Sequence, residues 1–117
     1  MESILTSIKL LLGMDEDYTA FDPDVIFHIN SVFAILTQLG VGPPNGFRIE
    51  DSSTTWLEYT QDNLLIEDVK TYMYLKVKLI FDPPSSSAVL SAMERLINEL
   101  EWRLNVAVDP ADTFERR

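Results

Sequence analysis

The triplet Asp82-Pro83-Pro84 divides the second half of the chain into two segments with helical character. Proline disfavours helical backbone at the residue before it, so the helix predicted to begin at Asp62 or Asn63 ends near Phe81. Three serines, 85 to 87, can cap a following helix. That helix carries a narrow apolar stripe formed by Val89, Leu90, Met93, Leu96, Ile97, Leu100 and Leu104. The pattern predicts two consecutive long helices joined by a proline turn.

The first half predicts two further helices. Residues 2–12 place Ile4, Leu5, Ile8, Leu11 and Leu12 on one helical face, and Gly13 ends that helix. Asp22-Pro23-Asp24 supplies a cap, a proline at the first helical position and an acid near the positive end of the helix dipole. A second helix therefore begins there, and Gly40 ends it.

Residues 41–53 separate the second and third long helices. Gly-Pro-Pro-Asn-Gly followed by the alternation at 47–51 predicts a protruding loop with one short strand, mobile in the isolated domain. Thr55 and Glu58 have the spacing of a capping box, which favours one helical turn. Residues 105–117 lose the helical periodicity. We therefore expect an all-α domain, a small four-helix bundle over residues 1–104 with an extended C-terminal tail over 105–117.

The chain is strongly acidic. Its 117 residues hold 19 acidic and 9 basic side chains, a formal charge of −10, so general binding to nucleic-acid phosphates is nearly excluded. With no cysteine, the sequence predicts no disulfide or thiolate chemistry and fits a reducing cytosol. Its apolar runs are short and its start lacks a secretion pattern, so we expect neither export nor a membrane span.

Motifs for catalysis and metal binding fail on their spacing. Asp15 and Asp17 suggest a calcium loop, but Ala20 and Ile26 would then replace its glycine and its bidentate glutamate. A single histidine, His28, cannot complete a common zinc site without cysteines and fits a half-buried packing position or an interface. No nucleophile elbow or phosphate-binding loop occurs. The sequence therefore predicts a protein that is not an enzyme and that has no metal and no cofactor.

Apolar residues outside the stripes indicate a second kind of surface. Trp102 lies nearly opposite the stripe of its own helix, and apolar residues cover most of the circumference of helix 63–81. Two explanations remain open at this point. Either a partner or another copy buries this surplus, or helix 63–81 is simply central and the tail covers Trp102.

The segment Tyr74-Leu75-Lys76-Val77-Lys78-Leu79-Ile80-Phe81-Asp82-Pro83-Pro84 and the later Glu99-Leu100-Glu101-Trp102-Arg103-Leu104 resemble the head-tail connector, or adaptor, family of tailed bacteriophages. The short first helix with its acidic loop, His28-Ile29-Asn30-Ser31 and the loop from Gly40 to Gly46 extend the resemblance over almost the whole chain. It implies a mostly helical structural protein of the virion, made in the host bacterial cytoplasm. Such proteins form a ring below the portal that extends the DNA channel to the neck or tail.

The resemblance also implies partners: the portal protein, a neck, stopper or tail-completion protein, and other copies in a ring of about twelve. DNA would pass through without sequence-specific binding. Element position suggests three sets of contact residues. The candidates are Tyr72, Tyr74 and Trp102 between subunits; Val106, Val108, Phe114, Arg116 and Arg117 at the portal; and Phe47, Arg48 and Ile49 toward a neighbouring subunit or neck protein.

Net negative charge suits a channel wall, because basic residues there would hold DNA phosphates. Two alternatives remain from the sequence: an acidic DNA mimic, and a helical binding module acting as a monomer. Mimicry needs carboxylates spaced like phosphates, whereas many of these acids lie at helix caps and in loops. A monomeric module leaves the apolar surplus without an explanation.

Overall fold

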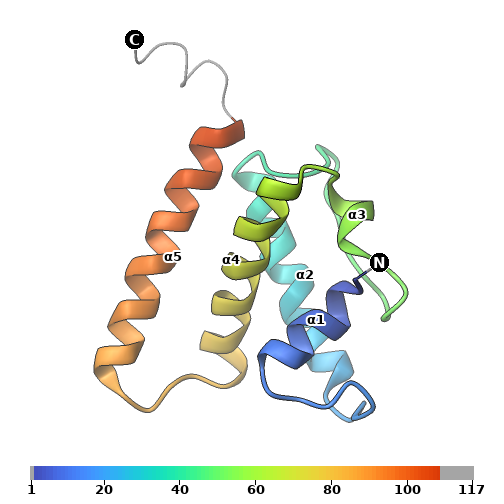
Figure 1. Cartoon of the computed structure of the whole chain (residues 1–117), viewed down its shortest axis with the longest axis vertical. Helices are drawn as coiled ribbons and strands as arrows, with labels where there is room; N and C mark the ends of the chain where they lie inside the picture. The colour runs from blue at the N-terminus through green and yellow to red at the C-terminus, as the bar shows by residue number, and fades with distance from the viewer. Residues whose placement is uncertain (1, 109–117) are drawn as a thin grey trace.

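The computed structural model describes residues 2–108, which form five helices (Figure 1). Their bounds are α1 (Ile4–Leu11), α2 (Asp22–Gln38), α3 (Trp56–Tyr59), α4 (Asn63–Phe81) and α5 (Ser87–Val108). Within the described residues there is no strand, only an isolated antiparallel bridge between Ser3 and Thr55. The all-α prediction with four longer helices is confirmed, and the short strand expected at 47–51 is wrong.

Local capping sets most helix starts. Ser3 accepts a hydrogen bond from the Thr6 amide, and Asp62 accepts from the amides of Leu64 and Leu65. The capping box at α3 forms as its spacing predicts, with Glu58 Oε2 2.9 Å from the Thr55 amide nitrogen. At α2 the cap is Phe21, one residue earlier than expected, and Asp22 is already helical.

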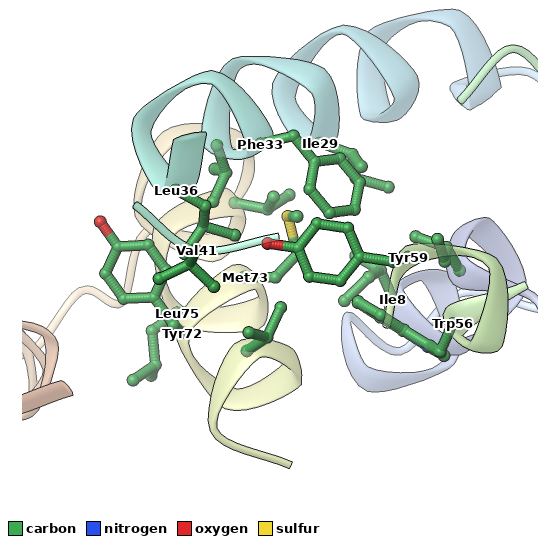
Figure 2. Close-up of a cluster of buried hydrophobic side chains, with 14 of the residues drawn as sticks. Ile8, Ile29, Phe33, Leu36, Val41, Trp56, Tyr59, Tyr72, Met73 and Leu75 are labelled. Atoms are coloured by element: carbon green, nitrogen blue, oxygen red, sulfur yellow. The ribbon is translucent and has the colours of Figure 1, made fainter. Parts of the chain in front are cut away.

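Helix α4 is the central element. It packs against α1, α2 and α5, and Tyr72 and Met73 at its middle are completely buried. Figure 2 shows these side chains meeting Phe33 and Leu36 of α2 in one continuous core. Neighbours in the same chain thus cover most of the apolar circumference of this helix, whereas Leu64 near its start and Ile80 near its end stay exposed.

Helix α5 lies at one edge of the molecule and packs along α4 (Figure 1). Only the C-terminal half of its stripe is well buried, at Ile97, Leu100 and Leu104, whereas Val89 and Leu96 stay exposed. At its far end Asn105 Nδ2 donates to the Leu39 carbonyl at 3.2 Å. The bundle is therefore a core of α1, α2 and α4 with α5 added to one side.

The loop after α2 is anchored to the core. Val41 and Ile49 are buried, and the Asn30 side chain binds both the amide and the carbonyl of Ile49, at 2.8 and 2.9 Å. Gly42 has a positive φ of 84°, and a Cβ there would lie 2.5 Å from the Tyr59 ring. The loop that the sequence predicts to protrude therefore places Val41 and Ile49 in the core, and its mobility in the isolated domain stays a prediction.

The C-terminal end of α5 also differs from the expectation. The helix continues through residues 105–108, so the prediction that an extended tail begins at Asn105 is wrong for these four residues. The hydrogen bond from Asn105 and the half-buried Val106 continue the packing past Leu104. Phe114, Arg116 and Arg117 lie outside the described residues.

Candidate interaction surface

Trp102 forms the most prominent apolar projection of α5. Its side chain is 61% exposed and points away from the face that carries the buried Leu100 and Leu104. Next to it, Arg103 binds Glu99 at 3.1 Å on its own helix and Asp68 of α4 at 2.9 Å. Surface ion pairs of this kind contribute little to stability.

A second surface lies on the outer side of α2. A pocket of about 500 Å³ is bounded there by Pro23, Ile26, Phe27, Asn30, Ser31, Ala34 and the loop residue Arg48. The buried residues of α2, such as Ile29 and Phe33, point to the core, so this lining belongs to the opposite half of the helix. Phe27 at its edge is 68% exposed.

Aromatic rings continue from this pocket toward the end of α4. Phe27 contacts His28, His28 contacts Phe81, and Phe81 contacts Phe21, with ring centroids 5.6, 6.5 and 5.5 Å apart. Tyr18 extends the row from Phe21 at 5.7 Å. His28 is half-buried, as the sequence suggested for a packing residue. An exposed apolar row of this size is typical of a surface that contacts another protein.

Two negative findings apply to the part of the chain that the structure describes. In residues 2–108, no three histidine, aspartate or glutamate side chains converge in a way that could hold a metal ion. The same part of the chain contains no helix with the length and hydropathy to cross a bilayer.

Comparison with known protein families identifies the family of this chain. The description "Phage connector protein" belongs to the family that matches residues 4–111. The chain belongs to the phage connector protein family. A search of curated proteins found no match, and a search of solved structures found none either. Phage connectors are structural proteins, and membership implies a place at the head–tail junction of the virion with partners from the portal–tail junction.

In this connector chain the structure separates the three residues expected between subunits. Tyr72 is buried completely, and its hydroxyl donates to Glu101 Oε2 at 2.7 Å. Burial raises the pKa of Tyr72, and the bonded Glu101 raises it further. Assigning Tyr72 to a contact surface is therefore wrong. Tyr74 is half-buried beside the core, and only Trp102 is strongly exposed.

The loop residues expected to contact a neighbour also differ from one another. Ile49 is part of the connector's core, so its assignment to an outer contact is wrong. Phe47 is half-buried, and its ring lies 5.1 Å from those of Phe33 and Tyr59. Arg48 alone is exposed, and it lines the α2 pocket.

The pocket and the aromatic row were not predicted. Pro23, Phe27, Asn30 and Ala34 recur at helical spacing on the side of α2 opposite its stripe, which is the one signal that the sequence contains. The sequence spacing could not predict that Arg48 lines the pocket. Its position depends on Asn30, whose side chain binds the backbone of the adjacent Ile49, 19 positions along the chain.

Proposed function

We propose that this connector assembles into a ring below the portal, continues the DNA channel and joins the capsid to the neck or tail. Exposure of Trp102 is the observation that carries this proposal. A tryptophan that is 61% exposed on the outer face of an edge helix is costly to leave in water and is the residue type most often found at energetic centres of interfaces. In a ring, a neighbouring subunit can bury this side chain.

The charge of the chain supports passage of DNA rather than binding. The acidic excess is concentrated in the first 68 residues, which hold twelve acids and two bases. If these carboxylates face the channel, they repel phosphates, whereas a basic wall would gain free energy from counterion release and retain the DNA.

Docking to the portal is assigned to the C-terminal end of the chain, as the resemblance suggests. Val106 lies half-buried in the last turn of α5, and the segment beyond it carries Phe114, Arg116 and Arg117. These two arginines end an otherwise acidic protein and suit an acidic site on the partner. The neck or tail protein would bind the ring on its other side.

The test is assembly on purified portal rings of the same phage. The full chain is mixed with portal rings, and the mixture is analysed by co-sedimentation and by electron microscopy. We expect an added ring of density with rotational symmetry and a fixed number of chains per portal. A chain that stays monomeric and unbound at saturating concentration would contradict the proposal.

A further inference from the structure

We infer that Trp102 of one copy inserts into the α2 pocket of the neighbouring copy, so that these two surfaces form the lateral contact of the ring. This inference rests on the ring proposed above. It identifies the two surfaces that form one interface, and the partner that occupies the pocket is a second copy of this chain.

Shape is the first argument. Trp102 is a projecting, exposed indole, whereas the α2 pocket is a shallow, open depression of about 500 Å³ whose lining includes Pro23, Ile26, Phe27 and Ala34. Large aromatic side chains prefer apolar pockets of this type, because burial removes both surfaces from water.

Charge is the second argument. Among the described residues Arg48 has no ion pair, like Lys76 and Arg95, whereas the basic side chains of Lys9, Lys70, Lys78 and Arg103 each have one. An arginine at the edge of the pocket can lie over the indole and at the same time share the carboxylate of Glu99, which already pairs with Arg103 of its own chain. The projection thus brings both an aromatic ring and a carboxylate to the free arginine.

A second charge pair can form between the same two surfaces with the signs reversed, with the base on α5 and the acid beside the pocket. Arg95, on the same outer side of α5 as Trp102, has no ion pair within residues 2–108. Glu50, two residues after Arg48, is exposed and also has no ion pair in this range. Two oppositely oriented charge pairs would therefore fix the orientation of one copy against the next.

Connectivity is the third argument. Helix α4 lies between α5 and α2, so the projection and the pocket belong to different outer sides of one chain (Figure 1). A contact between two different surfaces is head-to-tail, and it leaves one surface of each kind free for the next copy. Such contacts generate a closed ring when the rotation between copies closes.

The pocket is also held in place before any partner binds. Asn30 lines it and binds both backbone groups of Ile49, so the adjacent Arg48 backbone is fixed beside α2. A preformed site loses less entropy on binding than a mobile loop does.

Engineered cysteines test the contact directly, because the chain has none of its own. Ala34→Cys places a thiol in the pocket, and Asn98→Cys places one a turn before Trp102; both positions are exposed. In rings assembled on the portal, a short bismaleimide should link full chains carrying both changes into ladders. A mixture of the two single variants should give linked dimers only.

The matched control pairs Ala34→Cys with Ala88→Cys. Ala88 is exposed on the same helix but lies ten residues from Asn98, about 15 Å along the axis. It should give no linking above background. Rings that form without preferential linking of positions 34 and 98 would overturn this inference and leave the proposed function standing. If no assembly occurs with or without portal, both the proposed function and this inference are wrong.

A charge exchange gives a second test. Glu50→Arg and Arg95→Glu, which break no ion pair among residues 2–108, should each weaken lateral assembly by about tenfold, and the double variant should recover most of the loss. Trp102→Ala should weaken it by tenfold or more. If Trp102→Ala reduces portal binding but leaves the yield of linking between 34 and 98 unchanged, the tryptophan contacts the portal instead, and the inference is wrong.

Discussion

Tyr59 and Tyr72 are two buried tyrosines whose hydroxyl groups have different surroundings. The Tyr72 hydroxyl donates to Glu101, whereas the Tyr59 hydroxyl is buried without a hydrogen-bond partner among the described residues. A buried polar group without a partner has lost its hydrogen bonds to water and has formed none within the protein, which destabilises the folded state. The same residue type therefore has opposite effects on stability at these two positions.

Replacing each tyrosine by phenylalanine should reveal this difference. Tyr72→Phe removes a hydrogen bond to a charged group and should lower the free energy of unfolding by about 1–3 kcal/mol. Tyr59→Phe should leave it unchanged or raise it by up to about 1 kcal/mol. Urea denaturation of both variants measures the two values, and an equal loss would contradict the assignment of the Tyr59 hydroxyl.

Both tyrosines also predict sensitivity to alkali. Burial raises the pKa of Tyr59, and burial with Glu101 raises that of Tyr72, so both lie above the ordinary value of 10.0. The unfolded chain then releases these protons first as the pH rises, so the stability present below pH 10 is lost above it. Denaturation midpoints from pH 8 to 11.5 should fall, and less steeply in a Tyr59→Phe/Tyr72→Phe variant. Identical slopes would contradict the prediction.

Leu100 and Trp102 provide the residue-scale test of core against surface. Leu100 is 1% exposed, so Leu100→Ala should cost about 2–5 kcal/mol through the cavity that it leaves. Trp102→Ala should change the melting temperature of the isolated chain little. Thermal melts of the two variants check this, and a similar loss in both would place Trp102 in the fold rather than at an interface.

At the scale of elements, Lys9 joins α1 to the loop that precedes α2. Its side chain is nearly fully buried, lies 2.8 Å from Asp22 Oδ1 as an ion pair, and donates to the Glu16 carbonyl at 3.0 Å. The ion pair does not have hydrogen-bond geometry at Asp22 Oδ1, so the bond to Glu16 is the directional contact. The lysine thereby fixes the acidic loop 13–21 against the core.

Lys9→Ala should therefore lower the free energy of unfolding by about 2–4 kcal/mol, because it leaves the half-buried Asp22 carboxylate without its counter-ion and the Glu16 carbonyl without its donor. Lys70→Ala is the matched control. Its pair with Glu2 is closer to solvent and should cost less than about 1 kcal/mol. Chemical denaturation measures both, and equal effects would show that the buried pair contributes no more than the exposed one.

Helix positions were predictable because their signals are local. Pro83 and Asp62 act through their own backbone and their immediate neighbours, and both helix ends are confirmed. The end of α5 was not predictable, since Asn105 gains its partner Leu39 from another helix. The alternation at Phe47 and Ile49 reflects two side chains turned inward by a loop held to Asn30, and no second strand pairs with it.

The candidate site was predictable in part for the same reason. The helical wheel alone places Trp102 opposite its stripe, and the side chain is exposed. A wheel cannot tell whether apolar cover comes from the same chain or from a partner, which is why Tyr72 was assigned to a surface. The pocket needed Arg48 beside α2, a relation that only the tertiary structure contains.

At the scale of the whole molecule, the C-terminal end should separate folding from docking. A chain ending after Val108 keeps all of α5 and should retain the helical content and the melting temperature of the full protein, because every described core residue remains. It should fail to co-sediment with portal rings. Full binding by this chain would remove residues 109–117 from the portal contact.

A chain ending after Leu104 is the structural comparison for that experiment. It lacks the last turn of α5, with the Asn105 bond to Leu39 and the half-buried Val106. Its melting temperature should be lower than that of the chain ending after Val108. Circular dichroism melts distinguish the two, and identical melting temperatures would show that this turn does not stabilise the fold.

The position of α5 at the edge also affects how the protein is made. Residues 2–81 contain α1, α2, α3 and the central α4, and the isolated bridge between Ser3 and Thr55 closes within them. The ribosome releases this part first, so these elements can meet while the last helix is still being synthesised. Until α5 arrives, the side of α4 that it covers is open to water, and a nascent chain stalled at this point would be the form most exposed to aggregation or to capture by a chaperone.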